Sequence, residues 1–352
     1  MSKPLPLTFR IRLSASNADN FRNCLSEYQH ILSPLSVDAN IYQAPIPKSS
    51  LASQSPLLKA LLFKHSQDGT LARQELGSML PVLALRHAGY LHRSSRVLDM
   101  CASPGSKTLQ ALEIIGESGR IVANDVLESR LESLQQAVER SGMPKTLTSR
   151  ITYTCNDASQ LSIPTKLFDV IICDVPCSGD GTCRKDKHIL PIWKPNHGNQ
   201  LHATQVDILV RAIKLLKIGG CVCYSTCSLN PIEDEAVVAE TLRRTRSHEG
   251  EVELVEMPDL PGLIQREGIR EWRVADYTGE DTSDDEGEEV RLRWHSSMQD
   301  AVDSNMEKPL KSMWPCSDAD ELHLERCTRL WPQDQDSGGF FLALVRKKQR
   351  RG

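Results

Sequence analysis

Short apolar runs alternate with amphipathic segments along most of the chain from residue 96 onward. The apolar runs have the length of buried strands and lie at 96–100, 120–126, 151–157, 168–175, 221–227, 251–257 and 340–346. Helical patterns fill 107–116, 128–140 and 199–217, and Pro231 begins a further helix whose first turn carries Glu233, Asp234 and Glu235. This alternation predicts an α/β fold with a mostly parallel, doubly wound sheet.

The chain before residue 68 does not follow this pattern. Prolines interrupt residues 1–58, where one helix is predicted at 17–32, and leucines at helical spacing predict another helix at 68–88. We therefore expect a small N-terminal extension at 1–67, a core at 68–347 and a basic tail at 348–352. The segment 278–290 is too acidic to be buried, so it is predicted to be a disordered loop of the core.

The charge of the chain is unevenly distributed. The net charge is −4, but residues 280–289 carry seven carboxylates and no base, so the rest of the chain is positive by three. Residues 1–98 hold eleven Lys and Arg against five Asp and Glu, which makes the extension a candidate RNA contact. Solvated charged surfaces give the same pattern, so charge alone does not decide whether RNA is the partner.

The composition bears on compartment and metal content. No apolar run approaches the ~20 residues that span a bilayer, and the first residues lack the apolar stretch of a secretory signal. We expect an intracellular protein with no membrane partner, in which the eleven cysteines are buried, bound to metal or reactive. No C-x-x-C pair occurs, so no metal site is predicted.

Three successive predicted strands end in acidic residues. The first ends at Asp99 and leads into the small-residue turn Cys101-Ala102-Ser103-Pro104-Gly105-Ser106-Lys107, which matches neither the dinucleotide fingerprint nor the P-loop. The second ends at Asp125, suited to accept from ribose hydroxyls, and the third at Asp157, suited to accept from an exocyclic amine. Each carboxylate alone is as well explained as a helix cap. Together they favour a nucleoside without a pyrophosphate, which points to S-adenosylmethionine rather than NAD.

A cysteine follows each of the next two strands in the predicted sheet. The fourth strand leads into Asp174 and Cys177, and the fifth leads into Cys227. Either cysteine alone would be explained as a buried structural thiol. Two cysteines at neighbouring strand ends, flanked by small or polar residues, indicate reactive thiols at the mouth of the nucleoside site.

Three long motifs carry a family resemblance. LDMCASPGSKT at 98–108, DVPCSGDGT at 174–182 with Arg184-Lys185, and YSTCSLNPIEDEAVV at 224–238 resemble the signatures of RNA cytosine-5 methyltransferases of the RsmB/NOP/Sun-domain family. The eukaryotic tRNA-methylating subfamily is the most similar. The resemblance spans about residues 68–347, including Arg73-Gln74-Glu75 and Gly338-Gly339-Phe340-Phe341. Two departures are Ser103 in place of the usual alanine and Pro332–Gln335 in place of a histidine-containing stretch.

The resemblance implies a Rossmann-like methyltransferase core that binds S-adenosylmethionine through Cys101–Lys107, Asp125, Asp157 and Asp174. It also implies Cys227 as the nucleophile that adds to carbon 6 of cytosine and Cys177 as the cysteine that helps to release the product. The expected product is 5-methylcytosine in RNA, with tRNA as the expected substrate, and the target base must leave its stack to react. A monomer is expected, and the nucleus is favoured over the cytoplasm.

Two alternatives stay open from the sequence. A ribosomal-RNA cytosine methyltransferase would share both cysteines, although the runs DVPCSGDGTCRK and SLNPIEDEA are more typical of the tRNA branch. A catalytically silent RNA-binding scaffold would be expected to lose Cys227 or the donor-site carboxylates, and all of them are present here.

Overall fold

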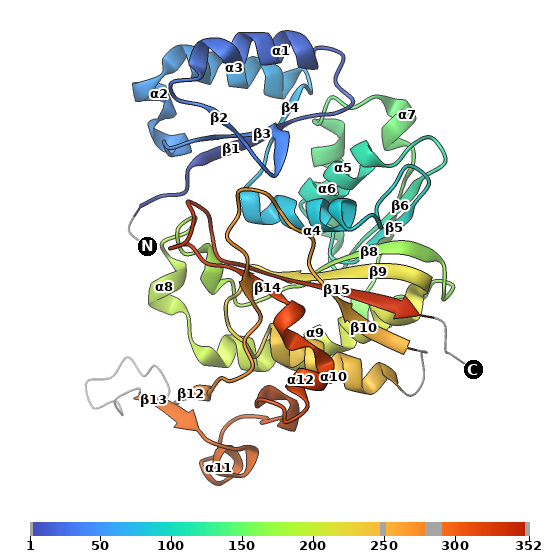
Figure 1. The fold of residues 1–352 in the computed structure, drawn as a ribbon, viewed down its shortest axis with the longest axis vertical. Coiled ribbons are helices and arrows are strands. Elements are labelled where there is room, and N and C mark those ends of the chain that lie inside the picture. Colours follow the sequence, from blue (N-terminus) through green and yellow to red (C-terminus); the bar gives the residue numbers. More distant parts are fainter. Residues whose placement is uncertain (1–2, 247–250, 279–290, 349–352) are drawn as a thin grey trace.

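The computed structural model describes residues 3–246, 251–278 and 291–348, and its central feature is a nine-stranded sheet (Figure 1). Five parallel strands stand in the order β9-β8-β5-β6-β7. Their bounds are β5 Arg96–Asp99, β6 Arg120–Asp125, β7 Ile151–Cys155, β8 Phe168–Asp174 and β9 Leu216–Thr226. Antiparallel strands extend the β9 edge: β15 Phe340–Lys348, β14 Thr328–Leu330, β11 Arg266–Glu267 and β10 Glu251–Val255. The predicted α/β class with a largely parallel central sheet is confirmed.

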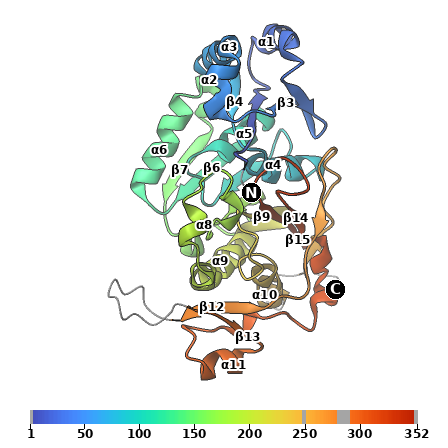
Figure 2. The same ribbon diagram turned by 90° about the vertical axis from the view of Figure 1, so that its left-hand side faces the viewer.

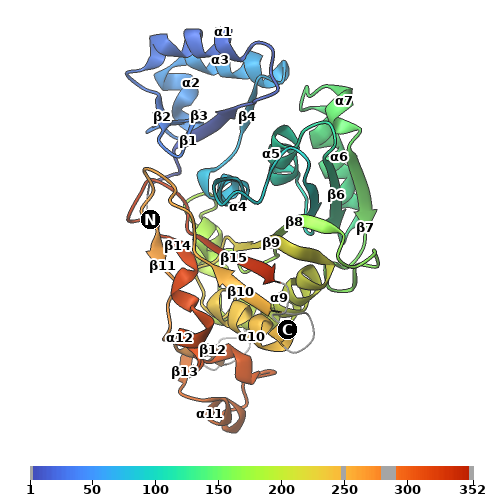
Figure 3. The same ribbon diagram turned by 45° about the vertical axis from the view of Figure 1, so that its right-hand side comes forward.

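Helices cover both faces of this sheet, as Figure 3 shows. One apolar core lies under α4 (Leu76–His87), α5 (Ser106–Ile114) and α6 (Glu128–Glu139), and α7 (Lys145–Thr148) adjoins it. The other lies under α9 (Pro195–Leu215), α10 (Glu235–Arg246) and α12 (Ala319–Leu322). Alternate residues of β8 enter the two cores, with Val170 and Ile172 on one face and Ile171 and Cys173 on the other. This double burial is why the strands read as continuous apolar runs.

The first 73 residues form a separate small unit rather than an irregular extension. Its antiparallel sheet has the order β2-β3-β1-β4, and its own apolar core includes Phe9, Phe21 and Leu58. The strands are β1 Leu7–Ile11, β2 Ser33–Leu35, β3 Asp38–Ala44 and β4 Leu71–Arg73, and the helices are α1 Ala18–Leu25, α2 Leu51–Gln54 and α3 Pro56–Gln67. Prolines hid these strands from the sequence pattern: Pro34 lies on edge strand β2, where the missing N–H is tolerated.

Two predicted helices differ from the observed ones near the N-terminus. The helix expected at 17–32 is α1 followed by a 3-10 turn, Ser26–Tyr28. The helix expected at 68–88 begins only at Leu76, because Leu71–Arg73 is the strand β4, which pairs with β1. The leucines before residue 76 therefore face the core of the N-terminal unit.

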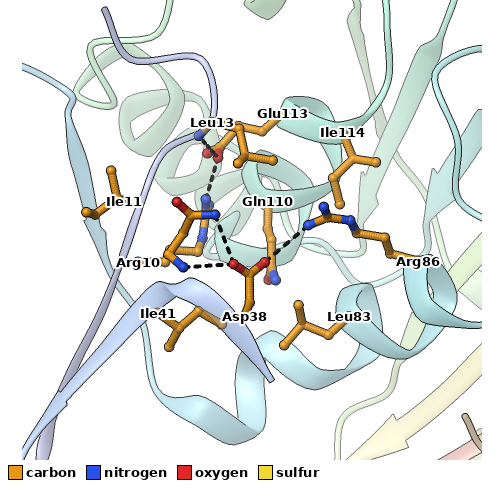
Figure 4. Close-up of a pocket in the computed structure, with 11 residues that line it drawn as sticks. Arg10, Ile11, Leu13, Asp38, Ile41, Leu83, Arg86, Gln110, Glu113 and Ile114 are labelled. Atoms are coloured by element: carbon orange, nitrogen blue, oxygen red, sulfur yellow. Dashed lines mark hydrogen bonds and ion pairs between the residues drawn. The ribbon is translucent and has the colours of Figure 1, made fainter. Parts of the chain in front are cut away.

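The N-terminal unit lies over α4 and α5 (Figure 2), and charged side chains lie in the seam between them (Figure 4). Arg10 on β1 pairs with Glu113 on α5 at 2.6 Å, and Asp38 at the start of β3 pairs with Arg86 on α4 at 3.1 Å. Figure 4 shows these groups around a hollow of about 20 Å³. Ion pairs and apolar contacts both join the unit to the core, since Val37 and Ile41 belong to the apolar core under α4.

A hairpin of β12 (Val274–Thr278) and β13 (Arg291–His295), followed by α11 (Met298–Asp303), projects at the far end of the molecule (Figure 1). The predicted acidic loop, beyond Thr278, and tail residues 349–352 lie outside the described residues. Among the residues that are described, no helix has the length and apolarity needed to cross a bilayer.

Candidate active site

The parallel strand order reverses between β5 and β8, and the predicted site residues gather at the carboxyl ends there. The chain moves outward from β5 to β6 and β7 and returns to β8 and β9. Ligands of open α/β sheets bind at this kind of switch point. Asp174 ends β8 directly beside Ser225 of β9, which places Cys177 and Cys227 on adjoining loops.

The turn Cys101–Lys107 connects β5 to α5. Gly105 adopts φ 101°, a left-handed conformation, and a Cβ at this position would overlap Leu134 of α6. The Ser103 amide donates to Asp125 Oδ2 at 3.1 Å, and the Ala102 amide donates to the Asn124 carbonyl at 2.8 Å. The turn is thereby fixed against the end of β6, as expected for a predicted donor-binding loop.

The two predicted nucleoside carboxylates differ in their surroundings. Asp125 is buried, and besides accepting from Ser103 it pairs with Arg130 Nε at 2.9 Å. Asp157 is exposed, and its Oδ1 accepts from the amide and hydroxyl of Ser159, both at 2.8 Å. Asp157 therefore caps a 3-10 turn, Ala158–Gln160, and within the described residues its side chain hydrogen-bonds Ser159 rather than the other site residues.

Asn124 connects three strand ends and was not predicted as a site residue. Its buried Nδ2 donates to the carbonyls of Met100 and Asn156, and its Oδ1 accepts from Thr154. A polar residue inside the apolar run RIVANDV is the signal that could have identified it. This amide holds the ends of β5, β6 and β7 in register.

Lys107 and Asp174 form an ion pair at the centre of the site. Lys107 Nζ lies 2.6 Å from Asp174 Oδ2, and Asp174 Oδ1 accepts from Ser225 Oγ at 2.6 Å. Burial lowers the pKa of Lys107, but attraction to Asp174, Asp99 and Cys227 outweighs it, so the pKa is raised. The ammonium group therefore stays charged and interacts electrostatically with Cys227.

Asp99 is a second acid with unusual surroundings. It is fully buried, its Oδ2 accepts from Thr108 Oγ1 at 2.7 Å, and its Oδ1 has no hydrogen-bond partner. Burial is the main cause that raises the pKa of Asp99 to about 7. Its unpartnered oxygen is the kind of group that a bound donor can satisfy.

The two predicted catalytic cysteines lie against each other. Cys177 Sγ and Cys227 Sγ are 3.3 Å apart, and both side chains are partly buried. Hydrogen bonding with Cys227, followed by burial, raises the pKa of Cys177 well above its ordinary value. Cys177 therefore keeps its proton and is suited to donate a hydrogen bond to the Cys227 sulfur.

Glu233 joins the two cysteine-bearing loops. Its carboxylate accepts from the Ser178 amide at 2.8 Å, from Ser178 Oγ at 2.5 Å and from Ser228 Oγ at 2.8 Å. Gln205 of α9 donates to the same carboxylate at 3.1 Å. Since Ser178 follows Cys177 and Ser228 follows Cys227, this one carboxylate sets the distance between the sulfurs.

The helix predicted to begin at Pro231 starts later than expected, so only one of the three acids lies in its first turn. All three are fully buried, and α10 begins only at Glu235. Asp234 accepts from Thr226 at 2.6 Å, and Arg329 pairs with both Asp234 and Glu235 beneath the Cys227 loop. Gly181 also supports this loop: its amide donates to the Cys227 carbonyl at 2.9 Å, and a Cβ there would lie 2.6 Å from that oxygen.

The basic loop Arg184–Lys187 is only partly available to a ligand. Arg184 is buried, where it donates to the carbonyls of Lys3 and Ser337 and pairs with Asp336. The Arg184 guanidinium is therefore not available to RNA phosphates, because it is bonded to groups inside the protein. Lys185 and Lys187 are exposed.

The donor set of the site matches the predicted methyl donor. Carboxylates at the ends of β5, β6 and β8, with another just after β7, would repel a pyrophosphate but accept from ribose hydroxyls and amines. A Cβ at Gly105 would meet Leu134, so glycine lets the turn pack closely against α6, and Asp99 Oδ1 has no hydrogen-bond partner among the described residues. Within the described ranges, no group of three or more His, Cys, Asp or Glu side chains is placed to hold a metal.

Comparison with known proteins identifies similar sequences. The family model described as 16S rRNA methyltransferase RsmB/F matches residues 90–270. A multisite-specific tRNA:(cytosine-C(5))-methyltransferase of Schizosaccharomyces pombe is 34% identical over 99% of this chain and 55% of its own length. Its namesake from Saccharomyces cerevisiae is 35% identical over 98% of this chain and 51% of its own length. The chain thus spans about half the length of these curated relatives.

A solved structure supports the fold. A methyltransferase homolog protein from Pyrococcus horikoshii superposes with a TM-score of 0.63 at 22% identity. The match covers 98% of this chain and 87% of that protein. The N-terminal unit and the core are therefore both included in the shared architecture.

Proposed function

The chain belongs to the RsmB/F methyltransferase family, as its motifs predicted, and on this premise we propose that it forms 5-methylcytosine in RNA with S-adenosylmethionine as methyl donor. The observation that carries the proposal is the pair of sulfurs 3.3 Å apart beside the Lys107–Asp174 ion pair. The proposed substrate is tRNA, because the curated relatives that match nearly the whole chain are named as tRNA enzymes. The nuclear location and the monomeric state stay predictions.

In the proposed mechanism Cys227 is the nucleophile. Its thiolate adds to carbon 6 of cytosine, close to the Lys107 ammonium, and the new bond makes carbon 5 nucleophilic. S-adenosylmethionine, when bound, supplies the methyl group that carbon 5 accepts. The carbon-5 proton is then lost to solvent with the assistance of Cys177. The electrons of that bond form the double bond between carbons 5 and 6, and the bond between Cys227 and carbon 6 breaks to regenerate the thiolate.

The remaining polar groups have supporting roles in this proposal. Cys101–Lys107, Asp125 and Asp157 hold the donor, with Asp125 at the ribose. Asp174, fixed by Lys107 and Ser225, adjoins both the donor and the base and is suited to hydrogen-bond the ring near N3. The target base must be extruded from its stack to reach these groups.

Trapping of the RNA adduct tests the roles of the two cysteines. Cys227→Ala should abolish methylation and form no adduct, because the nucleophile is gone. Cys177→Ala should stop after methyl transfer with RNA still attached through Cys227. A denaturing gel after incubation with donor and tRNA should therefore show a slow-migrating, RNA-dependent band for Cys177→Ala alone.

Other outcomes of the gel carry distinct meanings. A band for Cys227→Ala instead would reverse the two roles. No band for either variant, with both proteins folded, would mean that the cysteines are structural thiols only. Bisulfite sequencing of tRNA and rRNA from cells with and without the protein separates tRNA from rRNA, the substrate class in the family's own description.

Donor affinity tests the assignment of Asp125. Asp125→Ala should weaken binding of S-adenosylhomocysteine about ten- to a hundred-fold, since a hydrogen bond to a charged group contributes roughly 1.5–3 kcal/mol. Asp169→Ala is the matched control, because Asp169 is also ion-paired but lies near the opposite end of β8. Isothermal titration calorimetry measures both; equal affinities for the two folded variants would remove Asp125 from the donor site.

A further inference from the structure

A second cavity, of about 350 Å³, opens at the seam between the N-terminal unit and the core. The N-terminal unit contributes Arg10, Arg12 and Arg73, and α6 contributes Arg140. Pro104 and Ser106, on either side of the predicted donor-loop glycine, complete one wall. The proposed methyl-transfer reaction gives this cavity no role.

The arginines of this cavity carry more positive charge than their surroundings neutralise. Buried Arg10 and Arg12 share a single carboxylate, Glu113, at 2.6 Å and 3.7 Å. Arg73 and Arg140 are exposed at the opening and form no ion pair with any residue that the structure describes. Four guanidinium groups therefore face one cavity with one carboxylate behind them.

Arg12 shows that the cavity is short of an anion. Its side chain is 7% exposed, and its Nε has no hydrogen-bond partner among the described residues, although the guanidinium also donates to the Ser141 carbonyl. Burial and the neighbouring charge of Arg10 outweigh the attraction of Glu113 and lower the pKa of Arg12 to about 10. An oxyanion in the cavity would supply the missing negative charge, since Glu113 is the only carboxylate paired with Arg10 and Arg12 among the described residues.

We propose that this arginine cavity binds a backbone phosphate of the RNA substrate. The existence of the site is inferred from the cavity, and the identity of its ligand rests on the proposed function. Guanidinium groups recognise phosphate oxygens in a bidentate manner, and the hydroxyls of Ser66 and Ser106 are further donors among the lining residues. The site also gives a role to Arg73 of the Arg73-Gln74-Glu75 motif, while Gln74 accepts from Arg10 Nε and donates to Gln110, which fixes the wall.

The position of the cavity gives the contact a consequence for the reaction. Because Pro104 and Ser106 belong to the turn that is predicted to hold the donor, RNA seated on the arginines touches both units and the back of that turn. The N-terminal unit therefore acts as a second clamp on the substrate, at a place separate from the cysteines.

RNA affinity measured without methyl donor tests the site. The double variant Arg73→Gln/Arg140→Gln removes the two exposed arginines and leaves the buried pair intact, so it should fold. Arg96→Gln is the matched control, because Arg96 is an exposed arginine at the amino end of β5, away from the cavity. Filter binding of a tRNA transcript over a range of salt concentrations gives the affinity and its salt slope.

The double variant should bind RNA at least about ten-fold more weakly at low salt and lose about one unit of the slope of log affinity against log salt. The control should match the wild type. Equal affinity and slope for double variant and control would overturn the proposal.

Titration with inorganic phosphate separates a small-anion site from an RNA site. Thermal stabilisation of the wild type by phosphate, with RNA affinity unchanged in the double variant, would likewise overturn the RNA assignment. Because binding is read without donor, a protein that binds RNA through the arginines but never methylates it would contradict the proposed function and leave this site standing.

Discussion

Among the individual residues of the site, the pKa departs most from its ordinary value where the side chain is fully buried. Asp99 is the clearest case, because its carboxyl group lies inside the protein with one oxygen unpartnered. Its pKa is raised from 3.8 to about 7, mainly by burial. The folded protein therefore holds a proton on Asp99 that the unfolded chain releases near pH 4.

A pH dependence of stability follows from Asp99. Since the folded state binds the extra proton between about pH 4 and 7, its stabilising effect is complete below pH 4 and is lost as pH rises to 7. Relative to Asp99→Asn, the wild type should lose roughly 1.4 kcal/mol per pH unit across this window, on the order of 4 kcal/mol in all. Urea unfolding of both proteins from about pH 4 to 8 measures the difference; parallel curves would contradict the shift.

Glu233 is the positioning residue that this structure adds to the predicted site. Glu233→Gln keeps the size of the side chain but turns one acceptor oxygen into an amide donor facing the hydroxyls of Ser178 and Ser228. Adduct formation should slow by about ten-fold or more, because losing these hydrogen bonds removes roughly 1–3 kcal/mol of the free energy that holds the two cysteines in position. Affinity for S-adenosylhomocysteine should not change.

The matched control for this variant is Glu240→Gln on α10, where Glu240 makes a surface ion pair with Arg244. Its adduct rate should equal that of the wild type. A Glu233→Gln protein that forms adduct at the normal rate would show that the serine contacts do not position the sulfurs.

At the scale of elements, the sequence pattern located the buried core well. The strands β5 to β9 and the helices α5, α6 and α9 lie within about five residues of their predicted bounds. Strands such as β8 are buried on both faces and read as apolar runs. The strands of the N-terminal unit were missed because prolines and half-buried faces obscure their period.

The residues of the candidate site were predictable where they lie at the ends of these strands, but the contacts that support them were not. Cys177, Cys227 and the carboxylates stand at strand ends, which sequence position and motif reveal. Glu233, Asn124 and Arg329 support the site through contacts that were not predictable, because these contacts join segments that are far apart in sequence. The partners of Arg184 at residues 3 and 336–337 were not predictable for the same reason.

The whole molecule depends on a charged seam between its two units. Glu113 is the one carboxylate that Arg10 and Arg12 share, so Glu113→Ala should leave two buried guanidinium groups unpaired. Loss of one partner of a buried ion pair costs about 3–5 kcal/mol of unfolding free energy. Chemical unfolding measures it, with Glu117→Ala, at an exposed position just beyond α5, as control. A loss no larger than that of the control would mean that apolar contacts hold the units together.

The antiparallel strand β15 affects how the sheet can form during translation on the ribosome. Thr226, next to Cys227, pairs with Phe341, about 115 residues further along the chain. Until translation passes residue 348, a nascent chain carries β9 as an open edge, a template for association with other chains. The loop that carries Cys227 thus gains the support of the β9–β15 pairing only after nearly all of these residues have been translated.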